Sequence, residues 1–449
     1  MLVRLIPIVA VGLLLWGCAG SGHAPSADPY LAALATAASG DDASPAVLPD
    51  SATLDDYLRH AARENRALRA AFHRWEAAAQ RARAAGTPPD PRVSYSYFVR
   101  EVETRLGPQR HRISLVQSFP WFGTLRHQRS TAAHEVRAAA AVVEQRRLEL
   151  FHRFRSAWYE AWYLRRSAVV VAENLDLARY LADVVEARYR SGTVDYSRLL
   201  NARMEVERFA TELADVEDRI APLKARMNAD LNRPADAPIA IADSLERPDA
   251  LPGADSLAVR IARDNPELRR LREREAAASA RVNQVRAAHR PTIGLGIDYV
   301  VTDPRPDVDM PRNGEDPLMA MVSLNVPIWL GGNRAREAAA RAEARAASAE
   351  ATDRGTDLRT RLEGVLYRLR DAERRERLTT HELLPRARQS LEVSQAAFEA
   401  GREDFLDVIY HQRTLLRYRL DRERARVDRL LALSELETLL GAADQGDAR

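Results

Sequence analysis

The stretch that decides the fold runs from Gly123 to Gly192 and reads GTLRHQRSTAAHEVRAAAAVVEQRRLELFHRFRSAWYEAWYLRRSAVVVAENLDLARYLADVVEARYRSG. Between Leu125 and Arg188 it contains neither proline nor glycine, and apolar or small residues recur at alternating spacings of four and three. This spacing is typical of the heptad seam of a coiled coil. A helix of this length extends roughly 100 Å at about 1.5 Å per residue, so a long partner has to lie beside it.

The partner is predicted directly after Gly192. Apolar residues from Leu199 to Met227 again alternate threes and fours, which predicts a return helix over 196–232. Glycine readily adopts the positive φ with which a helix ends. We therefore expect the long helix over 124–188 to turn at a tip, residues 189–195, and to continue into the return helix as an antiparallel coiled-coil arm.

Composition limits the possible classes. The chain has 449 residues, of which 46% are hydrophobic, so it can bury a large core. Its 67 basic and 64 acidic residues leave a formal net charge of +3. Charges of both signs are mixed along the helices, and this pattern does not indicate a nucleic-acid-binding surface.

The first 17 residues are predicted to be a lipoprotein signal peptide. Arg4 precedes an apolar run that is too short to span a bilayer, and a small residue precedes Cys18, the only cysteine of the chain. We expect Cys18 to be the lipidated N-terminus of the mature protein, followed by an extended tether over 18–50 that is rich in Ala, Ser, Asp and Pro. The alternative is an ordinary signal peptide with a buried cysteine nearby.

The chain contains an internal duplication. Asn65 and Asn265, the stretches 91–97 and 291–297, and Gly192 and Gly401 stand at nearly constant offsets. Repeat 1 is expected over 51–232 and repeat 2 over 254–441, joined by a connector over 233–253 with a short strand at 239–241 and followed by a tail over 442–449. The remaining elements are expected as a first helix over 54–85, β-hairpins over 91–119 and 291–326, a second long helix over 333–398, a second tip over 399–405 and a second return helix over 406–441.

Each predicted strand has one apolar and one small or polar face. Val93, Tyr95 and Tyr97 alternate with Arg92, Ser94 and Ser96, and the other three strands alternate in the same way. This pattern is typical of a membrane barrel that encloses water. Four strands cannot close a barrel, and an open edge is not tolerated in lipid, so several copies would have to pool their strands; three copies would give twelve. The alternative is two amphipathic hairpins that cap a helical bundle.

The chain resembles the TolC-like outer-membrane efflux factors over essentially the whole mature sequence. The resemblance is carried by the strand-exit turns FPWFG at 119–123 and VPIWLGG at 326–332, the strand starts at Pro91 and Pro291, and the tip sequences at 188–195 and 398–408. With the lipoprotein signal, it is similar to the lipid-anchored subset that serves resistance-nodulation-division pumps.

The resemblance implies a mainly α fold with a small β part. It implies a homotrimer with a long α-helical coiled-coil barrel in the periplasm and a twelve-stranded β-barrel in the outer membrane, with four strands from each chain. The implied partners are a periplasmic adaptor protein, an inner-membrane pump and outer-membrane lipid. The implied function is that of a passive exit duct.

The resemblance also assigns roles at the tips. It implies that adaptor hairpins dock at Gly192 and Gly401, beside Thr193, Val194 and Arg402; alternatively these glycines only end their helices. It places an acidic pore constriction at Asp407, six residues after Gly401. The corresponding residue of repeat 1 is Arg198, which departs from the family pattern. An Arg198–Asp407 latch between neighbouring helices is therefore a hypothesis, and a solvated pair near a helix start is the alternative.

Prolines and glycines mark the junctions of strands and helices. Pro120 and Pro327 remove a backbone donor where a strand ladder stops. Gly123 and Gly331 are expected to permit the turn into the following helix.

No catalytic, metal or cofactor site is predicted. His127 and His134 lie seven residues apart but lack the further ligands of a metal motif. Phosphate-binding glycine loops and nucleophile elbows are missing from the sequence. Two other classes remain open: a lipid-anchored periplasmic coiled-coil structural or adaptor protein without a pore, and a soluble helical enzyme.

Overall fold

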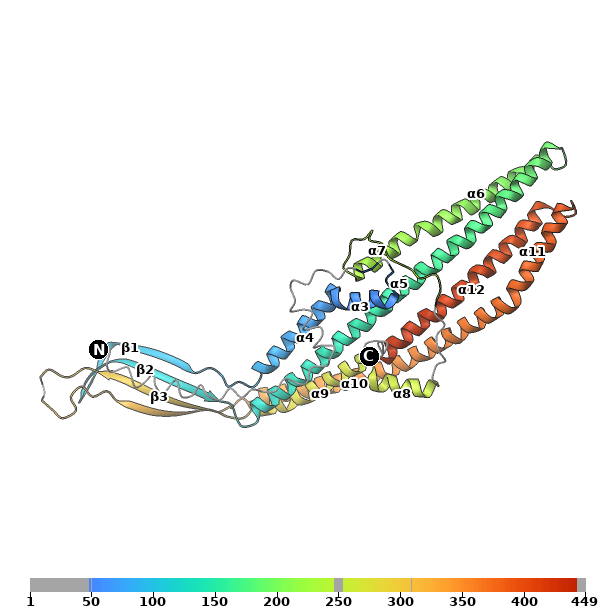
Figure 1. Cartoon of the computed structure of the whole chain (residues 1–449). Helices are drawn as coiled ribbons and strands as arrows, with labels where there is room; N and C mark the ends of the chain where they lie inside the picture. Colours follow the sequence, from blue (N-terminus) through green and yellow to red (C-terminus); the bar gives the residue numbers. More distant parts are fainter. Residues whose placement is uncertain (1–47, 50, 246–252, 308, 442–449) are drawn as a thin grey trace.

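The computed structural model describes residues 48–49, 51–245, 253–307 and 309–441. The predicted signal peptide, Cys18, nearly all of the tether, part of the connector and the tail lie outside these residues. The molecule is elongated, with a sheet at one end and long helices extending from it to two tips at the other (Figure 1). Among the described helices, none combines the length and the apolar character needed to cross a bilayer.

The order of elements is the same in both halves of the chain, as the duplication predicts. The first half contains α3 (Leu54–Glu64), α4 (Arg66–Ala84), β1 (Arg92–Thr104), β2 (Gly107–Phe119), α5 (Thr124–Arg190), α6 (Tyr196–Asp218) and α7 (Ile220–Asp230). The second half contains α8 (Ala254–Asp264), α9 (Pro266–Ala288), β3 (Thr292–Thr302), β4 (Leu318–Asn325), α10 (Leu330–Leu378), the π-helix η2 (Thr379–Leu383), α11 (Leu384–Glu399) and α12 (Phe405–Leu440).

Helix α5 is unbroken over its 67 residues. Its seam residues are buried, among them Phe154, Ala161, Val171 and Ala178. It packs against α6 as an antiparallel arm and also against α4, α9 and α12, so it contacts both repeats. The predicted long coiled-coil helix is therefore confirmed, and it organises the rest of the chain.

The predicted first helix over 54–85 is two helices, because Asn65 interrupts it. Asn65 is extended at ψ 118° and caps α4, where its side-chain oxygen accepts from the Leu68 N–H at 3.0 Å. Its amide donates to the carbonyl oxygen of Asp230 at 2.9 Å. Asn265 breaks the helix of repeat 2 in the same way, with its amide 2.9 Å from the carbonyl oxygen of Leu439.

Two further predicted helices are also interrupted, each next to a proline. The return helix over 196–232 breaks at Arg219, because Pro222 has no N–H to donate to the carbonyl of Asp218. The long helix over 333–398 begins earlier, at Leu330, and widens into η2 immediately before Pro385. Proline has no N–H, so the regular bonding of the α-helix is interrupted there, and a π-turn lets the chain continue as a helix.

The connector residues 239–241 do not form the predicted strand. They instead cover the core where α3 crosses α5. Ile239 and Ile241 are buried beside Trp158, and the Ala240 N–H donates to the Tyr57 hydroxyl at 2.8 Å. Trp158 and Trp162 are helix-packing residues of this core.

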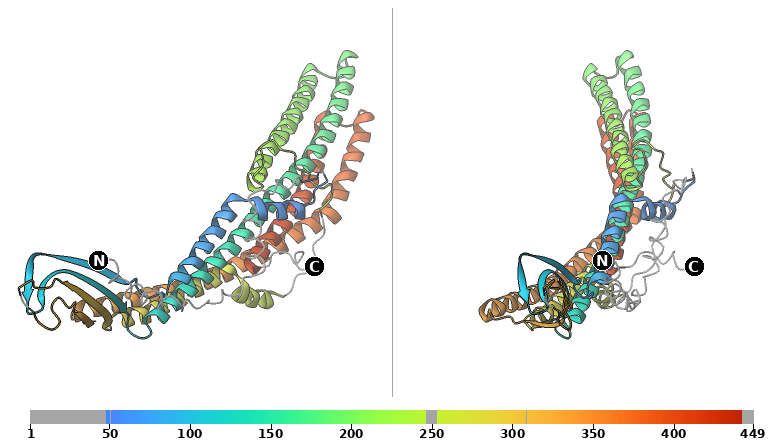
Figure 2. Two further views of the ribbon diagram at one scale, coloured as in Figure 1. Left: turned by 60° about the vertical axis from the view of Figure 1, so that its left-hand side comes forward. Right: turned by 90° about the vertical axis from the view of Figure 1, so that its left-hand side faces the viewer.

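The four strands form one antiparallel sheet in the order β1-β2-β3-β4, so the two hairpins are joined by β2 and β3. Large apolar side chains lie exposed along one face, including Val93 at 69% and Val322 at 75%. On the other face Asp298 is buried and pairs with Arg112 at 2.5 Å. The sheet lies at one end of the long helices (Figure 2).

The helices form two successive rows along the molecule. Next to the sheet, α5 and α9 pack together, with α4 against α5 and α10 against α9. Towards the tips, α5 and α12 pack together, with α6 against α5 and α11 against α12. Each arm is thus attached to the rest through its inner helix, α5 or α12 (Figure 1).

Candidate functional site at the helical tips

Both tips use the same helix-ending motif. At the end of α5 the Thr193 N–H donates to Arg188 O and the Gly192 N–H to Tyr189 O, both at 2.9 Å. At the end of α11 the Arg402 N–H donates to Ala397 O at 2.8 Å and the Gly401 N–H to Phe398 O at 3.0 Å. These paired bonds are those of the Schellman motif, which satisfies carbonyls that have no donor within the helix.

The tip glycines are required by their backbone conformation. Gly192 has φ 75° and Gly401 has φ 71°, both in the left-handed region. A Cβ built on either would meet no heavy atom within 4 Å. The turns are therefore open on the outside. Gly192, Thr193, Gly401 and Arg402 are exposed, whereas Val194 is partly buried against the core of the tips.

The second tip is capped more completely than the first. Asp404 and Asp407 form a capping box at the start of α12, in which Asp407 accepts from the Asp404 N–H. The side chain of Glu403 accepts a hydrogen bond from Ser394 of α11. By contrast, Asp195 at the start of α6 makes no side-chain capping bond.

Within one chain, the structure shows a different partner for Arg198 from the one in the hypothesised Arg198–Asp407 latch. Arg198 instead pairs with Asp404, whose carboxylate lies 3.4 Å from its guanidinium. Asp407 is exposed and turned towards the backbone of its own helix. The two residues predicted at the pore constriction therefore lie near the same helix start but in different interactions.

A partly buried carboxylate stabilises the first arm close to its tip. Glu186 of α5 accepts from Arg203 of α6 at 3.2 Å and from Arg190 one turn later on its own helix. The hydrogen bond from Arg203 and then that from Arg190 lower the pKa of Glu186. The glutamate thus stays ionised and links the two helices of the arm.

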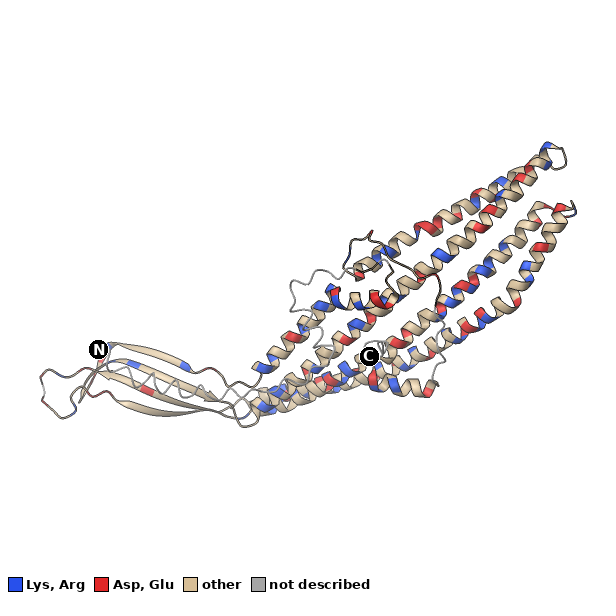
Figure 3. Ribbon diagram, viewed as in Figure 1, with Lys and Arg blue, Asp and Glu red and all other residues tan. Residues whose placement is uncertain are grey.

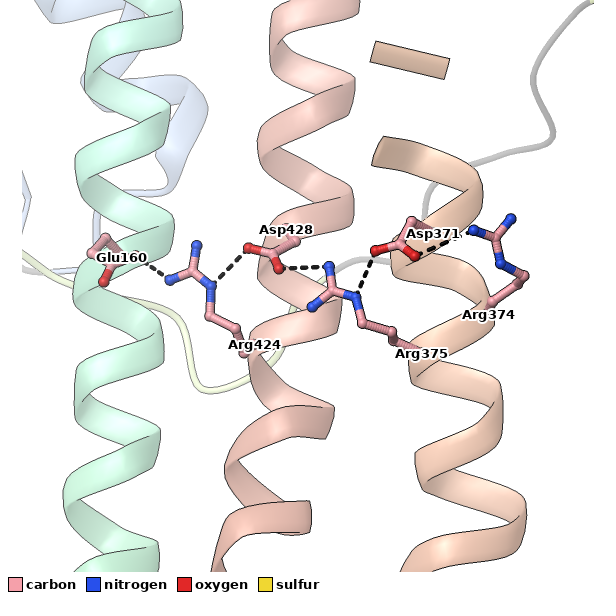
Figure 4. A network of polar contacts seen from close by, with 6 residues as sticks. All are labelled: Glu160, Asp371, Arg374, Arg375, Arg424 and Asp428. Carbon is pink, nitrogen blue, oxygen red and sulfur yellow. Dashed lines mark hydrogen bonds and ion pairs between the residues drawn. The ribbon is translucent and has the colours of Figure 1, made fainter. Parts of the chain in front are cut away.

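Further from the tips, a chain of ion pairs crosses three helices (Figure 4). Arg424 of α12 contacts Glu160 of α5 at 2.6 Å and Asp428 at 2.7 Å. Asp428 also contacts Arg375 of α10 at 2.9 Å, and Arg375 contacts Asp371 at 2.8 Å. Although burial alone would lower the pKa of Arg424, its carboxylate partners outweigh this and raise it. The chain of ion pairs joins the inner helices of both repeats.

The two strand-to-helix junctions differ from each other. Gly123 has φ 89° and is the N-cap of α5, as predicted for a turn glycine. Gly331 is not a turn residue, because α10 begins at Leu330 and Gly331 lies in its first turn. Pro120 and Pro327 follow the last residues of β2 and β4, and Pro91 and Pro291 precede β1 and β3.

Sequence reasoning missed an exposed aromatic pair at these junctions. Phe122 is 85% exposed and Trp329 is 78% exposed. They occupy corresponding positions in the strand-exit turns of the two repeats, so the duplication could have identified them. Exposed aromatic rings at the end of a sheet are typical of a membrane–water interface.

Of the two histidines considered as ligands, His134 makes a structural contact. His134 lies 2.8 Å from Glu273 of α9, which Arg137 also contacts at 2.9 Å. Burial would raise the pKa of Glu273, but the hydrogen bonds from His134 and Arg137 outweigh it and lower the pKa. Over residues 48–441, apart from the stretches left undescribed, no three His, Cys, Asp or Glu side chains gather as a metal ion requires.

A family match covers both repeats of the chain. Residues 57–227 and 257–442, which are nearly the whole of the two repeats, match the family described as outer membrane efflux protein. The chain belongs to the outer membrane efflux protein family. This confirms the predicted family, and the two matched segments coincide with the duplication.

Individual relatives of this efflux family protein are distant. It is 24% identical over 343 residues to OpmQ, a pyoverdine export outer membrane protein of Pseudomonas putida, covering 75% of this chain and 71% of OpmQ. It is 25% identical over 222 residues to CyaE of Bordetella pertussis, covering 49% of this chain and only 46% of CyaE.

The fold of this family protein is shared with solved channels. The structure of the outer-membrane channel OprN superposes with a TM-score of 0.73 at 18% identity, covering 94% of this chain and 98% of OprN. The predicted mainly helical fold with a small β part is thus confirmed. Neither the family nor the fold supports the pore-less adaptor, and the role of the family, efflux through a channel, is not an enzymatic one.

Proposed function

We propose that this protein is the outer-membrane exit duct of a tripartite efflux system. In this role it conducts solutes passively from a periplasmic adaptor and an inner-membrane pump across the periplasm and the outer membrane. The energy is supplied by the pump, so the duct needs only a bore, a polar wall and a gate.

The observation that carries the proposal is the sheet. It exposes large apolar side chains on one face, holds Ser114, Asp298 and Arg112 on the other, and leaves β1 and β4 as edges within the chain. In lipid such edges must be paired. A homotrimer in which β4 of one copy pairs with β1 of the next closes a barrel of twelve strands, with the apolar face towards lipid.

The proposed anchor and location rest on the sequence. We propose that Cys18 is acylated and that the tether over 18–50 leads from the outer membrane to α3. Phe122 and Trp329 then lie at the periplasmic surface of that membrane, where exposed aromatic rings are favoured.

The open Schellman turns suit the docking of an adaptor. Gly192, Thr193, Gly401 and Arg402 are exposed at the far end of the molecule and leave space for a partner backbone, with Val194 supporting the first turn from below. We expect an adaptor of the kind that serves resistance-nodulation-division pumps to contact these residues.

Two measurements on the purified full-length protein test the duct. Light scattering in detergent is expected to give three copies per particle, and planar bilayers are expected to show discrete conductance steps. A particle with one copy, or a bilayer that stays silent, would refute the proposal.

A test of the constriction at Asp407 has to separate its charge from its role in the capping box of α12. Asp407→Asn keeps an acceptor for the Asp404 N–H and removes the charge. A ring of three carboxylates attracts cations, so the variant is expected to lower the preference for cations over anions. Asp407→Ala removes both the cap and the charge. Unchanged ion selectivity in Asp407→Asn would exclude Asp407 from the constriction.

A further inference from the structure

The positive charge of the chain is concentrated where the helices meet the sheet. The ranges 73–91, 120–135, 277–291 and 326–341 contain eleven arginines and four acidic residues, a surplus of seven, whereas the whole chain has a net charge of +3. We call these arginines the arginine collar: Arg74, Arg81, Arg83, Arg126, Arg129, Arg281, Arg286, Arg290, Arg334, Arg336 and Arg341. All eleven are exposed.

The four ranges come together in space although they are far apart in sequence. Arg129 of α5 donates to the carbonyl oxygen of Gly86, just after α4, at 2.9 Å. Arg286 of α9 pairs with Glu337 of α10 at 2.6 Å. Since α5 also packs along α9, the ends of all four helices lie side by side next to the sheet. Basic residues are prominent on these helix ends in Figure 3.

Most of the collar is not neutralised within the chain. Glu337 pairs with both Arg286 and Arg341. Arg83, Arg126 and Arg334 form no ion pair with any residue that the structure describes, and they come from three different helices. These guanidinium groups remain available to an external anion.

Exposed apolar side chains lie directly between the collar and the sheet. Ile328 is 68% exposed and Leu330 is 62% exposed, on either side of the exposed Trp329 in the sequence. Along the molecule the surface thus changes from the apolar face of the sheet to aromatic and aliphatic residues and then to arginines. This order matches a lipid layer from its acyl chains to its headgroups.

We propose that the arginine collar binds the phosphates of anionic phospholipids at the periplasmic surface of the outer membrane. The inference rests on the proposed function, which places the sheet in that membrane. Guanidinium groups bind phosphate oxygens in a bidentate manner, and each arginine near an anionic surface adds to the attraction. The collar fixes the depth of the duct in the membrane by gripping headgroups while the apolar residues above it enter the acyl region.

The tryptophans offer a direct probe. Trp75, Trp121 and Trp329 lie within the collar ranges, whereas Trp158 and Trp162 are buried in the helical core. The purified full-length protein is reconstituted in phosphatidylcholine vesicles, and its fluorescence is quenched with brominated phosphatidylglycerol or brominated phosphatidylcholine. Stronger quenching by the brominated phosphatidylglycerol is expected, and high salt is expected to reduce the difference.

A matched pair of variants isolates the collar. In Arg83→Gln/Arg126→Gln/Arg334→Gln the preference for the anionic lipid is expected to fall by roughly fivefold or more. The control Arg166→Gln/Arg377→Gln/Arg388→Gln removes the same charge from exposed positions nearer the tips and is expected to retain the preference.

The outcomes separate this inference from the proposed function. Equal quenching by both lipids in the wild type, or an equal loss in both triple variants, would overturn the collar. So would a collar variant that changes the ion selectivity of the channel and leaves lipid preference unchanged, because its arginines would then face the lumen. If neither brominated lipid quenches at all, the sheet is not in lipid and the proposed function fails as well.

Discussion

Arg188, near the end of α5 at the first tip, contacts the end of α11, the helix that leads into the second tip. Its Nη2 donates to the carbonyl oxygen of Phe398 at 2.7 Å, and its guanidinium carbon lies 4.3 Å from the centroid of the Phe398 ring. The Phe398 carbonyl also accepts from the Gly401 N–H of the Schellman motif, so Arg188 adds a second, charged hydrogen bond to this carbonyl while its guanidinium lies over the ring. The two arms are thereby joined at their ends.

Arg188→Ala is expected to loosen this joint. The lost charged hydrogen bond and cation–π contact are worth about 1–3 kcal/mol. With spin labels at positions 193 and 402 in a Cys18→Ser background, the distance distribution between the tips is expected to broaden. Arg188→Lys keeps the charge but not the planar fork, so it is expected to recover only part of the wild-type distribution. Identical distributions in all three proteins would contradict the joint.

Gly192→Ala and Gly331→Ala are expected to have opposite effects on the melting temperature. A Cβ meets nothing within 4 Å at either position, so only the backbone differs. Gly192 has positive φ, where alanine costs about 1–2 kcal/mol. Gly331 is helical and exposed, where alanine is favoured by up to about 1 kcal/mol. Circular dichroism during heating measures the melting temperature of each variant. If both melting temperatures shift in the same direction, the backbone conformations assigned to Gly192 and Gly331 are refuted.

Asn265→Ala is expected to destabilise the second repeat. It removes the cap of α9, typically worth about 1 kcal/mol, and leaves the buried carbonyl of Leu439 without the Asn265 amide, at about 1–3 kcal/mol. Asn283→Ala on the exposed surface of the same helix is the control. Denaturant unfolding should separate the two; equal midpoints would show that the buried amide contributes little.

Stability is expected to decline as the pH falls below about 6.5, the usual pKa of histidine. His60 is buried and its Nε2 lies 3.2 Å from the carbonyl oxygen of Leu231, while Nδ1 is buried without a partner. Burial lowers the pKa of His60 and likewise that of His152. The unfolded chain therefore binds more protons, so the stabilisation is complete above about 6.5 and is lost as the pH falls through the lowered pKa.

The measurement is the melting temperature at pH 7.5 and pH 5.5. His60→Gln retains a donor for Leu231 but cannot be protonated, so its loss of stability on acidification should be smaller than in the wild type. His73→Gln, at an exposed histidine of α4, should behave like the wild type. An unchanged acid loss in His60→Gln would remove His60 as a cause.

Sequence patterns predicted what depends on local spacing. The seam of α5 and the positive φ of Gly192 and Gly401 follow from residues close in the chain. The partner of the Asn65 amide does not, because the carbonyl of Asp230 lies 165 residues away. The heptad seam does not predict the π-turn before Pro385, because its apolar spacing continues on both sides of the proline.

The candidate site was predicted less completely than the fold. The spacing from Gly401 predicts Asp407 at the constriction. In the structure Asp407 belongs to the capping box of α12, and Asp404 is the residue that forms the ion pair with Arg198. The similar motifs at Gly123 and Gly331 predict the same role as a turn glycine, but only Gly123 has a left-handed backbone conformation. The arginine collar is divided among four segments, so it is recognisable only when the helix ends are placed side by side.

The two outer strands of the sheet have a consequence for how such a duct comes into being. Each of β1 and β4 hydrogen-bonds to one neighbour in the described chain, and a bare strand border in hydrocarbon costs several kcal/mol for each unpaired backbone group. In the proposed trimer, one or two copies would leave an outer strand unpaired, so we expect incomplete rings to stay out of lipid. Under that proposal, membrane insertion and closure of the ring are expected to occur together, so that no partly closed and leaking ring forms in the membrane.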